Sequence, residues 1–179
     1  MDDSPSVLRL DLSRAPSVLY FYGLAGAGKS YVAELVGRLA GWRVYDADSD
    51  LTPELRQALA EQRHFTLEML DRFFVVVSAR ITQLARTHGW LAVSQATYRR
   101  RHREYLISHV RDMDMICVTA QDATILKRLR RRGGDVTPDY AALMKLGFEL
   151  PPVGAKVLEN DGGDAQIVSQ LNRMYGRSE

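Results

Sequence analysis

The chain has 179 residues, of which 46% are hydrophobic and 26% are charged, and its formal net charge is +2. This length suits one globular domain, and this composition excludes an intrinsically disordered chain. The single cysteine, Cys117, excludes an intrachain disulfide framework and a multi-cysteine metal site, and its apolar neighbours predict a buried, inert thiol.

The first residues, MDDSPS, are acidic and lack an apolar segment, so we expect no signal peptide. No apolar run reaches the roughly 20 residues that a membrane-spanning helix needs. We therefore expect a cytoplasmic protein that does not associate with membranes. Basic residues gather between Arg99 and Arg132, and this distribution predicts an anionic ligand on one side of the molecule.

The first half of the chain alternates between predicted strands and helices. Residues 1–16 form either a tail or an added edge strand, because SVLRLDL alternates only weakly. An apolar strand at 17–22 leads into a glycine-rich loop and an amphipathic helix. Residues 42–48 (WRVYDAD) are predicted to form a second strand, and Thr52-Pro53 starts a helix. A long apolar stripe from Leu70 to Leu84 then predicts a helix that ends at Gly89.

The alternation continues to the end of the chain, with strands predicted at 90–96, 113–120 and 155–160. Helices are expected around Ile125–Leu129, after Thr137-Pro138, and around Ile167–Leu171. This order predicts a three-layer α/β/α fold with a five-stranded, mainly parallel sheet. No linker divides the sequence, so we treat residues 17–179 as one domain, with ligands expected at the carboxyl ends of the strands.

The loop GLAGAGKS matches the phosphate-loop pattern from Gly23 to Ser30 in full. Glycines let successive N–H groups point inward, and the helix that follows adds its positive end. Lys29 can reach the β- and γ-phosphates, and the Ser30 hydroxyl can bind Mg²⁺. The motif therefore predicts binding of a nucleoside triphosphate on a P-loop NTPase fold. The residues expected to contact it in this segment are Gly23, Ala25, Gly26, Ala27, Gly28, Lys29, Ser30 and Tyr31.

Two acids follow the second predicted strand, in the sequence Asp46-Ala47-Asp48. They are expected at the carboxyl edge of the sheet, opposite the phosphate loop. One carboxylate can then join the Mg²⁺ shell, and the other can accept a proton from a substrate hydroxyl. The alternative is a solvated acidic turn that also includes Asp50.

Arginines dominate the segment LKRLRRRGGD, from Leu126 to Asp135. Phosphoryl transfer needs positive charge on the migrating group, and a hinged arginine lid at about 128–138 can supply it. Arg128 and Arg132 are therefore candidate catalytic residues, and Arg128 also a nucleotide contact. The alternative is that these cations only stabilise the end of their helix.

A second basic segment, YRRRHRE, covers Tyr98 to Glu104. Its arginines can bind a substrate carboxylate or phosphate, bind nucleic acid, or form a solvated helix face. We interpret His102 as part of that polar face and not as a catalytic base. Farther on, Asn160 in ENDGG is expected against the purine, the alternative being an ordinary turn before Asp164.

With these residues in hand, the chain from 17 to 175 resembles the small carbohydrate and metabolite kinases of the nucleoside-monophosphate-kinase fold. It is closest to the gluconate kinases and next to the shikimate kinases. GLAGAGKS matches the family loop and DAD its D-G-D or D-T-D. YRRRHREYL is similar to L-K-x-x-Y-R-D-x-L, and KRLRRRGGDVTPDYAALMKLGFELPP resembles the lid region. The resemblance places Asp46 in the metal shell, Asp48 at the acceptor hydroxyl, and Arg99 and Arg103 on the acceptor.

The chain departs from the family on the acceptor side. Gluconate kinases carry His-Pro, Asn and Lys-Met after D-G-D, where this chain has Leu51-Thr52, Leu55 and Ala58-Leu59. The family serine after the third strand is Ala96. The donor side therefore matches the family well, and the acceptor side matches it poorly.

Together these observations predict an ATP- and Mg²⁺-dependent kinase for a hydroxyl of a small anionic metabolite such as a sugar acid. The choice of ATP over GTP comes from the resemblance. A polynucleotide or nucleotide kinase and a nucleotide-responsive regulatory module are the alternatives. Gluconate kinases often form homodimers, although no surface evident in this sequence requires one.

Overall fold

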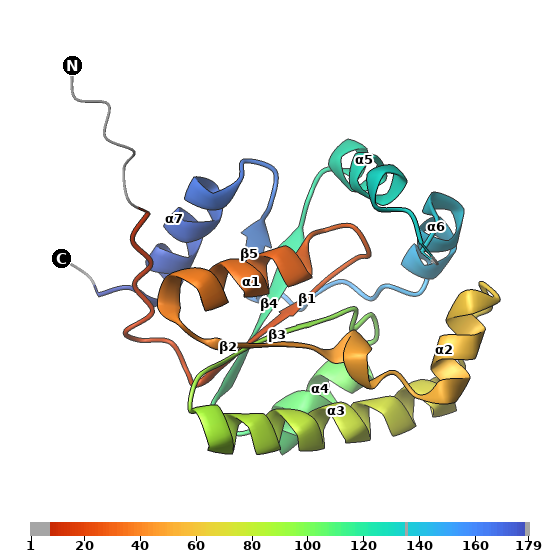
Figure 1. Cartoon of the computed structure of the whole chain (residues 1–179), viewed down its shortest axis with the longest axis horizontal. Helices are drawn as coiled ribbons and strands as arrows, with labels where there is room; N and C mark the ends of the chain where they lie inside the picture. The colour runs from red at the N-terminus through yellow and green to blue at the C-terminus, as the bar shows by residue number, and fades with distance from the viewer. Residues whose placement is uncertain (1–7, 135, 178–179) are drawn as a thin grey trace.

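The computed structural model describes residues 8–134 and 136–177. Five strands form one sheet in the order β2-β3-β1-β4-β5, and every pairing between neighbouring strands is parallel. The predicted five-stranded α/β fold is therefore confirmed (Figure 1). The strands are β1 (Val18–Tyr22), β2 (Arg43–Asp46), β3 (Leu91–Gln95), β4 (Met113–Thr119) and β5 (Lys156–Glu159).

Local sequence signals explain where three of the seven α-helices in the described residues begin. The side-chain oxygens of Thr52, Thr66 and Thr137 each accept a hydrogen bond from a backbone N–H of the helix that follows, which satisfies a donor in its first turn. The helices are α1 (Lys29–Ala40), α2 (Pro53–Ala60), α3 (Leu67–His88), α4 (Arg100–His109), α5 (Asp122–Arg132), α6 (Pro138–Lys145) and α7 (Asp164–Tyr175).

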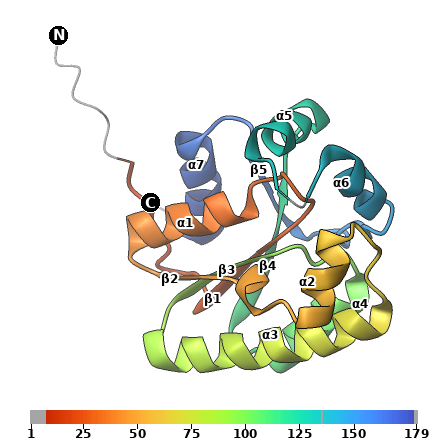
Figure 2. The same cartoon turned by 45° about the vertical axis from the view of Figure 1, so that its right-hand side comes forward.

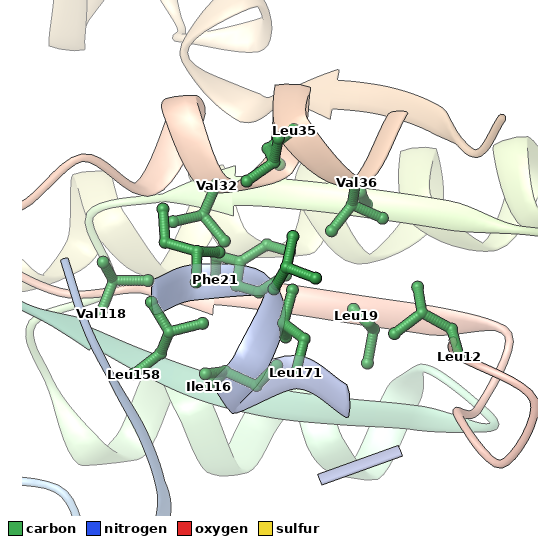
Figure 3. Packing of buried hydrophobic residues seen from close by; sticks show 14 of the residues in the cluster. Leu12, Leu19, Phe21, Val32, Leu35, Val36, Ile116, Val118, Leu158 and Leu171 are labelled. Carbon is green, nitrogen blue, oxygen red and sulfur yellow. The ribbon is translucent and has the colours of Figure 1, made fainter. Parts of the chain in front are cut away.

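The sheet separates two apolar cores. Alternate residues of β1 point to opposite faces: Leu19 and Phe21 join a core with α1 and α7, whereas Val18 and Tyr20 join a core with α3 and α4. Figure 3 shows the first core, where α1, α7 and the sheet pack together. Because both faces are covered, ligands have access to the sheet only at its ends.

The second strand is shorter than the sequence predicts. β2 ends at Asp46, and residues Ala47–Asp50 form a 3-10 turn (η1) instead of continuing the strand. The carboxylate of Asp46 accepts a hydrogen bond from the Asp48 backbone N–H, and this contact turns the chain out of the sheet.

The segment before β1 forms no strand over residues 8–16. Leu12 enters the core shared by α1 and α7, and the Asp11 backbone N–H donates to the side chain of Asn172 on α7 at 2.8 Å. Residues 1–7 of the proposed tail and Asp135 of the proposed lid lie outside the described residues.

The far end of the sheet carries two tryptophans whose rings pack against each other at a tilt. Trp42 and Trp90 precede β2 and β3, and their ring centroids are 5.3 Å apart. They therefore lie at the amino ends of the strands, away from the P-loop. Within the described residues, no helix is both long enough and apolar enough to span a bilayer.

Candidate functional site

The phosphate loop joins β1 to α1 and is held close to its neighbours. Gly23 has a φ of 147°, and a Cβ built there would lie 2.3 Å from the Val118 carbonyl oxygen. Gly28 has a φ of 93°, and its Cβ would lie 2.2 Å from Nδ2 of Asn160. Both positions therefore require glycine, for conformation and for space.

Lys29 and Ser30 open α1 and lie at the centre of the site. The Lys29 ammonium donates to the Leu24 carbonyl oxygen at 2.9 Å, and burial lowers its pKa to about 8, against the charges of Asp48 and Asp46. The Ser30 hydroxyl donates to Asp46 Oδ2 at 2.9 Å and accepts from Ser94 at 3.3 Å. A cation and the hydroxyl that is predicted to bind Mg²⁺ thus lie beside the predicted acids.

Asp46 and Asp48 are brought to the same edge of the sheet, as their spacing predicts. Asp48 accepts a hydrogen bond from the Gln95 side chain at 3.0 Å. Burial raises the pKa of Asp48, and the neighbouring charge of Asp46 raises it further. A carboxylate with a raised pKa is a stronger proton acceptor than an exposed one.

Ser94 and Gln95 orient Ser30 and Asp48, and our sequence interpretation missed both. A signal was present, because these two polar residues end a strand that is otherwise apolar. Tyr98, also missed in this role, accepts a hydrogen bond from the Ala25 backbone N–H at 3.0 Å and so supports the phosphate loop from the other side.

Arg128 and Asn160 support the outside of the phosphate loop. Arg128 donates to the carbonyl oxygens of Ala27 at 3.2 Å and Asn160 at 2.7 Å, and the Asn160 amide donates to Ala27 at 2.9 Å. Neither side chain lines the cavity described below. In this structure loop carbonyl oxygens occupy these donors, and the predicted contacts of Arg128 with the γ-phosphate and of Asn160 with the purine stay predictions.

Arg132 and Tyr31 occupy different positions relative to the site. Arg132 lines the cavity, and its charge lowers the pKa values of both Asp48 and Lys29. Tyr31 is exposed and hydrogen-bonds Asp164 on α7, outside the cavity. The structure thus brings Arg132 near the predicted acids, and the predicted contact of Tyr31 with the nucleotide stays a prediction.

The two arginines predicted to hold the acceptor also separate. Arg99 lines the cavity, with its nearest guanidinium nitrogen 3.8 Å from a Glu149 oxygen. Arg103 is 4% exposed, does not line the cavity, and donates to the carbonyl oxygens of Thr97, Tyr98, Glu149 and Leu150. Its predicted contact with the acceptor is not supported, because its donors hold two backbone segments together.

His102 corrects another expectation, since it is not part of a solvated polar face. It is 2% exposed, stacks on Phe74 at 4.7 Å, and its Nε2 lies 2.7 Å from Asp71 Oδ1. Its Nδ1 is buried without a hydrogen-bond partner. Burial lowers the pKa of this imidazole, which favours its neutral form.

A cavity of about 630 Å³ extends from the phosphate loop and the two acids into the space between α2, α3 and α6. Figure 2 shows these three helices together beside the end of the sheet. The volume falls within the range of small-molecule sites. Among the described residues, no cluster of three or more His, Cys, Asp or Glu side chains is placed to hold a metal. Any Mg²⁺ at Ser30 and Asp46 would therefore need oxygen ligands from phosphate and water.

No protein-family model matches the chain, and no curated protein matches it by sequence. Solved structures do match. A gluconokinase from Sinorhizobium meliloti 1021 is 19% identical, with 90% of this chain and 95% of that chain covered and a TM-score of 0.74. A sugar kinase from Janibacter sp. HTCC2649 is 17% identical, with 88% and 93% covered and a TM-score of 0.75.

An APS kinase from Mycobacterium tuberculosis, solved in complex with AMPPNP and APS, is 22% identical, with 89% and 95% covered and a TM-score of 0.60. At these identities the likeness establishes the fold and nothing finer. The chain has the fold of the P-loop kinases over nearly its whole length.

Proposed function

We propose that this protein is a phosphotransferase that uses ATP and Mg²⁺ to phosphorylate a hydroxyl group of a small molecule. The observation that carries the proposal is the meeting of Lys29, Ser30, Asp46 and Asp48 at one end of a cavity with room for a second molecule. The neighbours with this fold support it, since they include a gluconokinase, a sugar kinase and an APS kinase with AMPPNP bound.

The donor would bind to the loop from Gly23 to Ser30. Backbone N–H groups of this loop would surround its phosphates. The Lys29 ammonium would exchange the Leu24 carbonyl for a phosphate oxygen. Ser30 and Asp46 offer the hard oxygen donors that Mg²⁺ prefers, and the metal would offset the charge of the β- and γ-phosphates.

The acceptor hydroxyl would lie at Asp48, which Gln95 holds in place. As the acceptor oxygen bonds to the γ-phosphorus, the bond from this phosphorus to the β–γ bridging oxygen breaks and ADP leaves. The hydroxyl proton passes to Asp48. Arg132 would stabilise the migrating phosphoryl group, and Arg99 would pair with an anionic group of the acceptor.

A sugar acid remains the acceptor that the sequence resemblance predicts, and the gluconokinase neighbour supports it. The polynucleotide kinase alternative loses most of its support. Arg101 pairs with Asp71 at 2.8 Å and Arg103 is buried, so the basic segment on α4 does not present the free row of cations that a phosphate backbone needs.

The test is ADP release and product detection with Mg·ATP and a panel of alcohols, for the natural chain and Asp48→Asn. We expect Asp48→Asn to lower phosphoryl transfer by about 100-fold or more while Mg·AMPPNP binding persists. For the natural chain, kcat/KM should fall with decreasing pH through a pKa above 3.8, because Asp48 must be ionised to accept the proton.

Asp50→Asn is the matched control, because the same chemical change then occurs two residues away. Asp50 does not line the cavity and is hydrogen-bonded to Tyr45 and Arg80. We expect this variant to keep its transfer activity. If Asp48→Asn left nucleotide turnover intact and no acceptor raised it, the chain would instead be a nucleotide-responsive binding module.

A further inference from the structure

The half of the cavity beyond Asp48 is lined mainly by apolar side chains. Leu51 follows η1, and Leu59 lies in the last turn of α2. Phe65 lies in the loop before α3, and Leu70 lies near the start of α3. These four leucine and phenylalanine residues come from separate segments that face one space. Their shared chemistry favours an apolar molecule in contact with them.

The opposite wall of this half is apolar as well. Leu143 on α6 and Leu146 just after it line the cavity, yet they are 36% and 85% exposed. Leu67 at the start of α3 also lines it and is 47% exposed. A ligand between α3 and α6 would cover these side chains, and removing their surface from water would favour its binding.

The polar side chains that line this half are few: His64, Gln95, Tyr98, Arg99, His102 and Tyr140. His102 contacts Asp71 through Nε2, and its buried Nδ1 has no hydrogen-bond partner. The hydroxyls of Tyr98 and Tyr140 are bonded to backbone groups of Ala25 and Arg63. Gln95 is bonded to Asp48. A ligand with hydroxyls along its whole length would bury several of them without partners, which opposes its binding. Arg99 is one cation here with a loose pairing, at 3.8 Å from Glu149.

We infer that the phosphoryl acceptor is an alcohol with an apolar body, aliphatic or aromatic, and a single anionic group at Arg99. Its hydroxyl lies at Asp48 and its body lies between α2, the start of α3 and α6. This inference rests on the proposed phosphotransferase function and specifies its substrate class. The inferred acceptor is an amphipathic acid and not the polyhydroxylated sugar acid that the sequence resemblance predicts.

Two six-carbon acids test the inference with little else changed. Gluconate and 6-hydroxyhexanoate share the carboxylate, the chain length and the terminal hydroxyl, and differ in the four hydroxyls between them. With Mg·ATP, we expect kcat/KM for 6-hydroxyhexanoate to exceed that for gluconate by about tenfold or more. A second apolar probe is 4-(hydroxymethyl)phenylacetate. Phosphorus NMR identifies the phosphate ester formed.

A pair of leucine variants tests where the apolar body of the acceptor binds. Leu143→Gln adds polarity to the cavity wall, whereas Leu126→Gln changes a leucine of similar exposure, 38%, on α5 outside the cavity. We expect Leu143→Gln to lower kcat/KM for 6-hydroxyhexanoate about fivefold or more, without lowering that for gluconate. Leu126→Gln should leave both values unchanged.

The outcomes separate the two proposals. Preference for gluconate over both apolar probes overturns the inference and leaves the phosphotransferase standing. If no alcohol is phosphorylated, calorimetry on the Mg·AMPPNP complex compares the binding of the apolar probes with that of gluconate. The inference is also overturned if both apolar probes fail to bind or bind more weakly than gluconate. A chain that does not bind Mg·AMPPNP contradicts the proposed function itself.

Discussion

Lys29 shows at the scale of one residue how burial changes the pKa of a charged group. Its ammonium donates to the Leu24 carbonyl oxygen in this structure, and burial lowers its pKa to about 8. Near that pH a fraction of the molecules carries a neutral amine. A triphosphate beside the same nitrogen favours the charged form and raises the pKa again.

Nucleotide binding should therefore take up protons. At about pH 8 we expect uptake approaching about half a proton per Mg·AMPPNP bound, and close to none at about pH 6.5, where Lys29 is already charged. Calorimetry in two buffers of different ionisation enthalpy measures it. The Lys29→Met variant should no longer bind Mg·AMPPNP tightly. Equal proton uptake at both pH values would contradict the assignment of the uptake to Lys29.

Residues whose positions follow from their neighbours in the sequence were predictable. Residues whose side chains bond to distant segments of the chain were not. Asp46 and Asp48 lie at the end of β2 or just beyond it, and Lys29 and Ser30 begin the helix that follows the glycine loop, so their positions follow from the alternation of elements. Arg103 is different, because its guanidinium reaches carbonyl oxygens some 46 and 47 residues along the chain. No local pattern in the sequence encodes those partners.

At the scale of elements, Arg103 holds the start of α4 against the segment that follows α6. It also lies over the rings of Tyr22 and Phe148, with its Cζ 5.1 and 5.9 Å from their centroids. Since Arg99 and Leu146 come from these same two segments, Arg103 positions part of the cavity wall without contacting a ligand.

Replacing Arg103 should cost stability. We expect Arg103→Met to lower the free energy of unfolding by about 3 kcal/mol, because buried carbonyl oxygens lose their donors. Arg101→Met on the exposed face of the same helix should lower it by less than about 1 kcal/mol. Urea unfolding monitored by circular dichroism measures both, and equal losses would show that the backbone contacts of Arg103 contribute little.

Helix starts were well predicted because their signals are local. The Thr-Pro pairs at 52–53 and 137–138 begin α2 and α6 where the sequence places them. The expectation that His102 lies on a solvated polar face of α4 was wrong, because Phe74 and Asp71 on α3 cover this side chain and supply its partners.

At the scale of the whole molecule, the sheet joins two cores that meet only at its strands. Binding at the carboxyl ends of the strands contacts segments from both sides, with α1 on one side and Asp48 and the start of α3 on the other. Any ligand that binds only the folded chain must stabilise the folded state as a unit.

Mg·AMPPNP should raise the melting temperature accordingly. At a concentration about 100 times its Kd, binding adds about 2.7 kcal/mol. For a chain of this size, that corresponds to a rise in Tm of roughly 5–10 °C. Scanning calorimetry checks it, and Lys29→Met should show little or no rise. A rise of the same size in that variant would mean that the nucleotide binds elsewhere.

The fold class could be predicted from sequence because alternating strands and helices determine it. The apolar half of the cavity could not be predicted. Its walls come from Leu51, Leu59, Phe65 and Leu143, which lie in separate segments, and a leucine in a helix is usually a core residue. Only the arrangement of α2, α3 and α6 shows that these side chains face a shared space.

The packed pair of Trp42 and Trp90 has a practical consequence for all of these measurements. They are the two tryptophans of the chain, and neither lines the cavity. Intrinsic fluorescence should therefore respond strongly when the chain unfolds and the rings separate. It should change little when nucleotide or acceptor binds at the opposite end of the sheet. The same optical signal can thus follow denaturation at any ligand concentration without a contribution from binding itself.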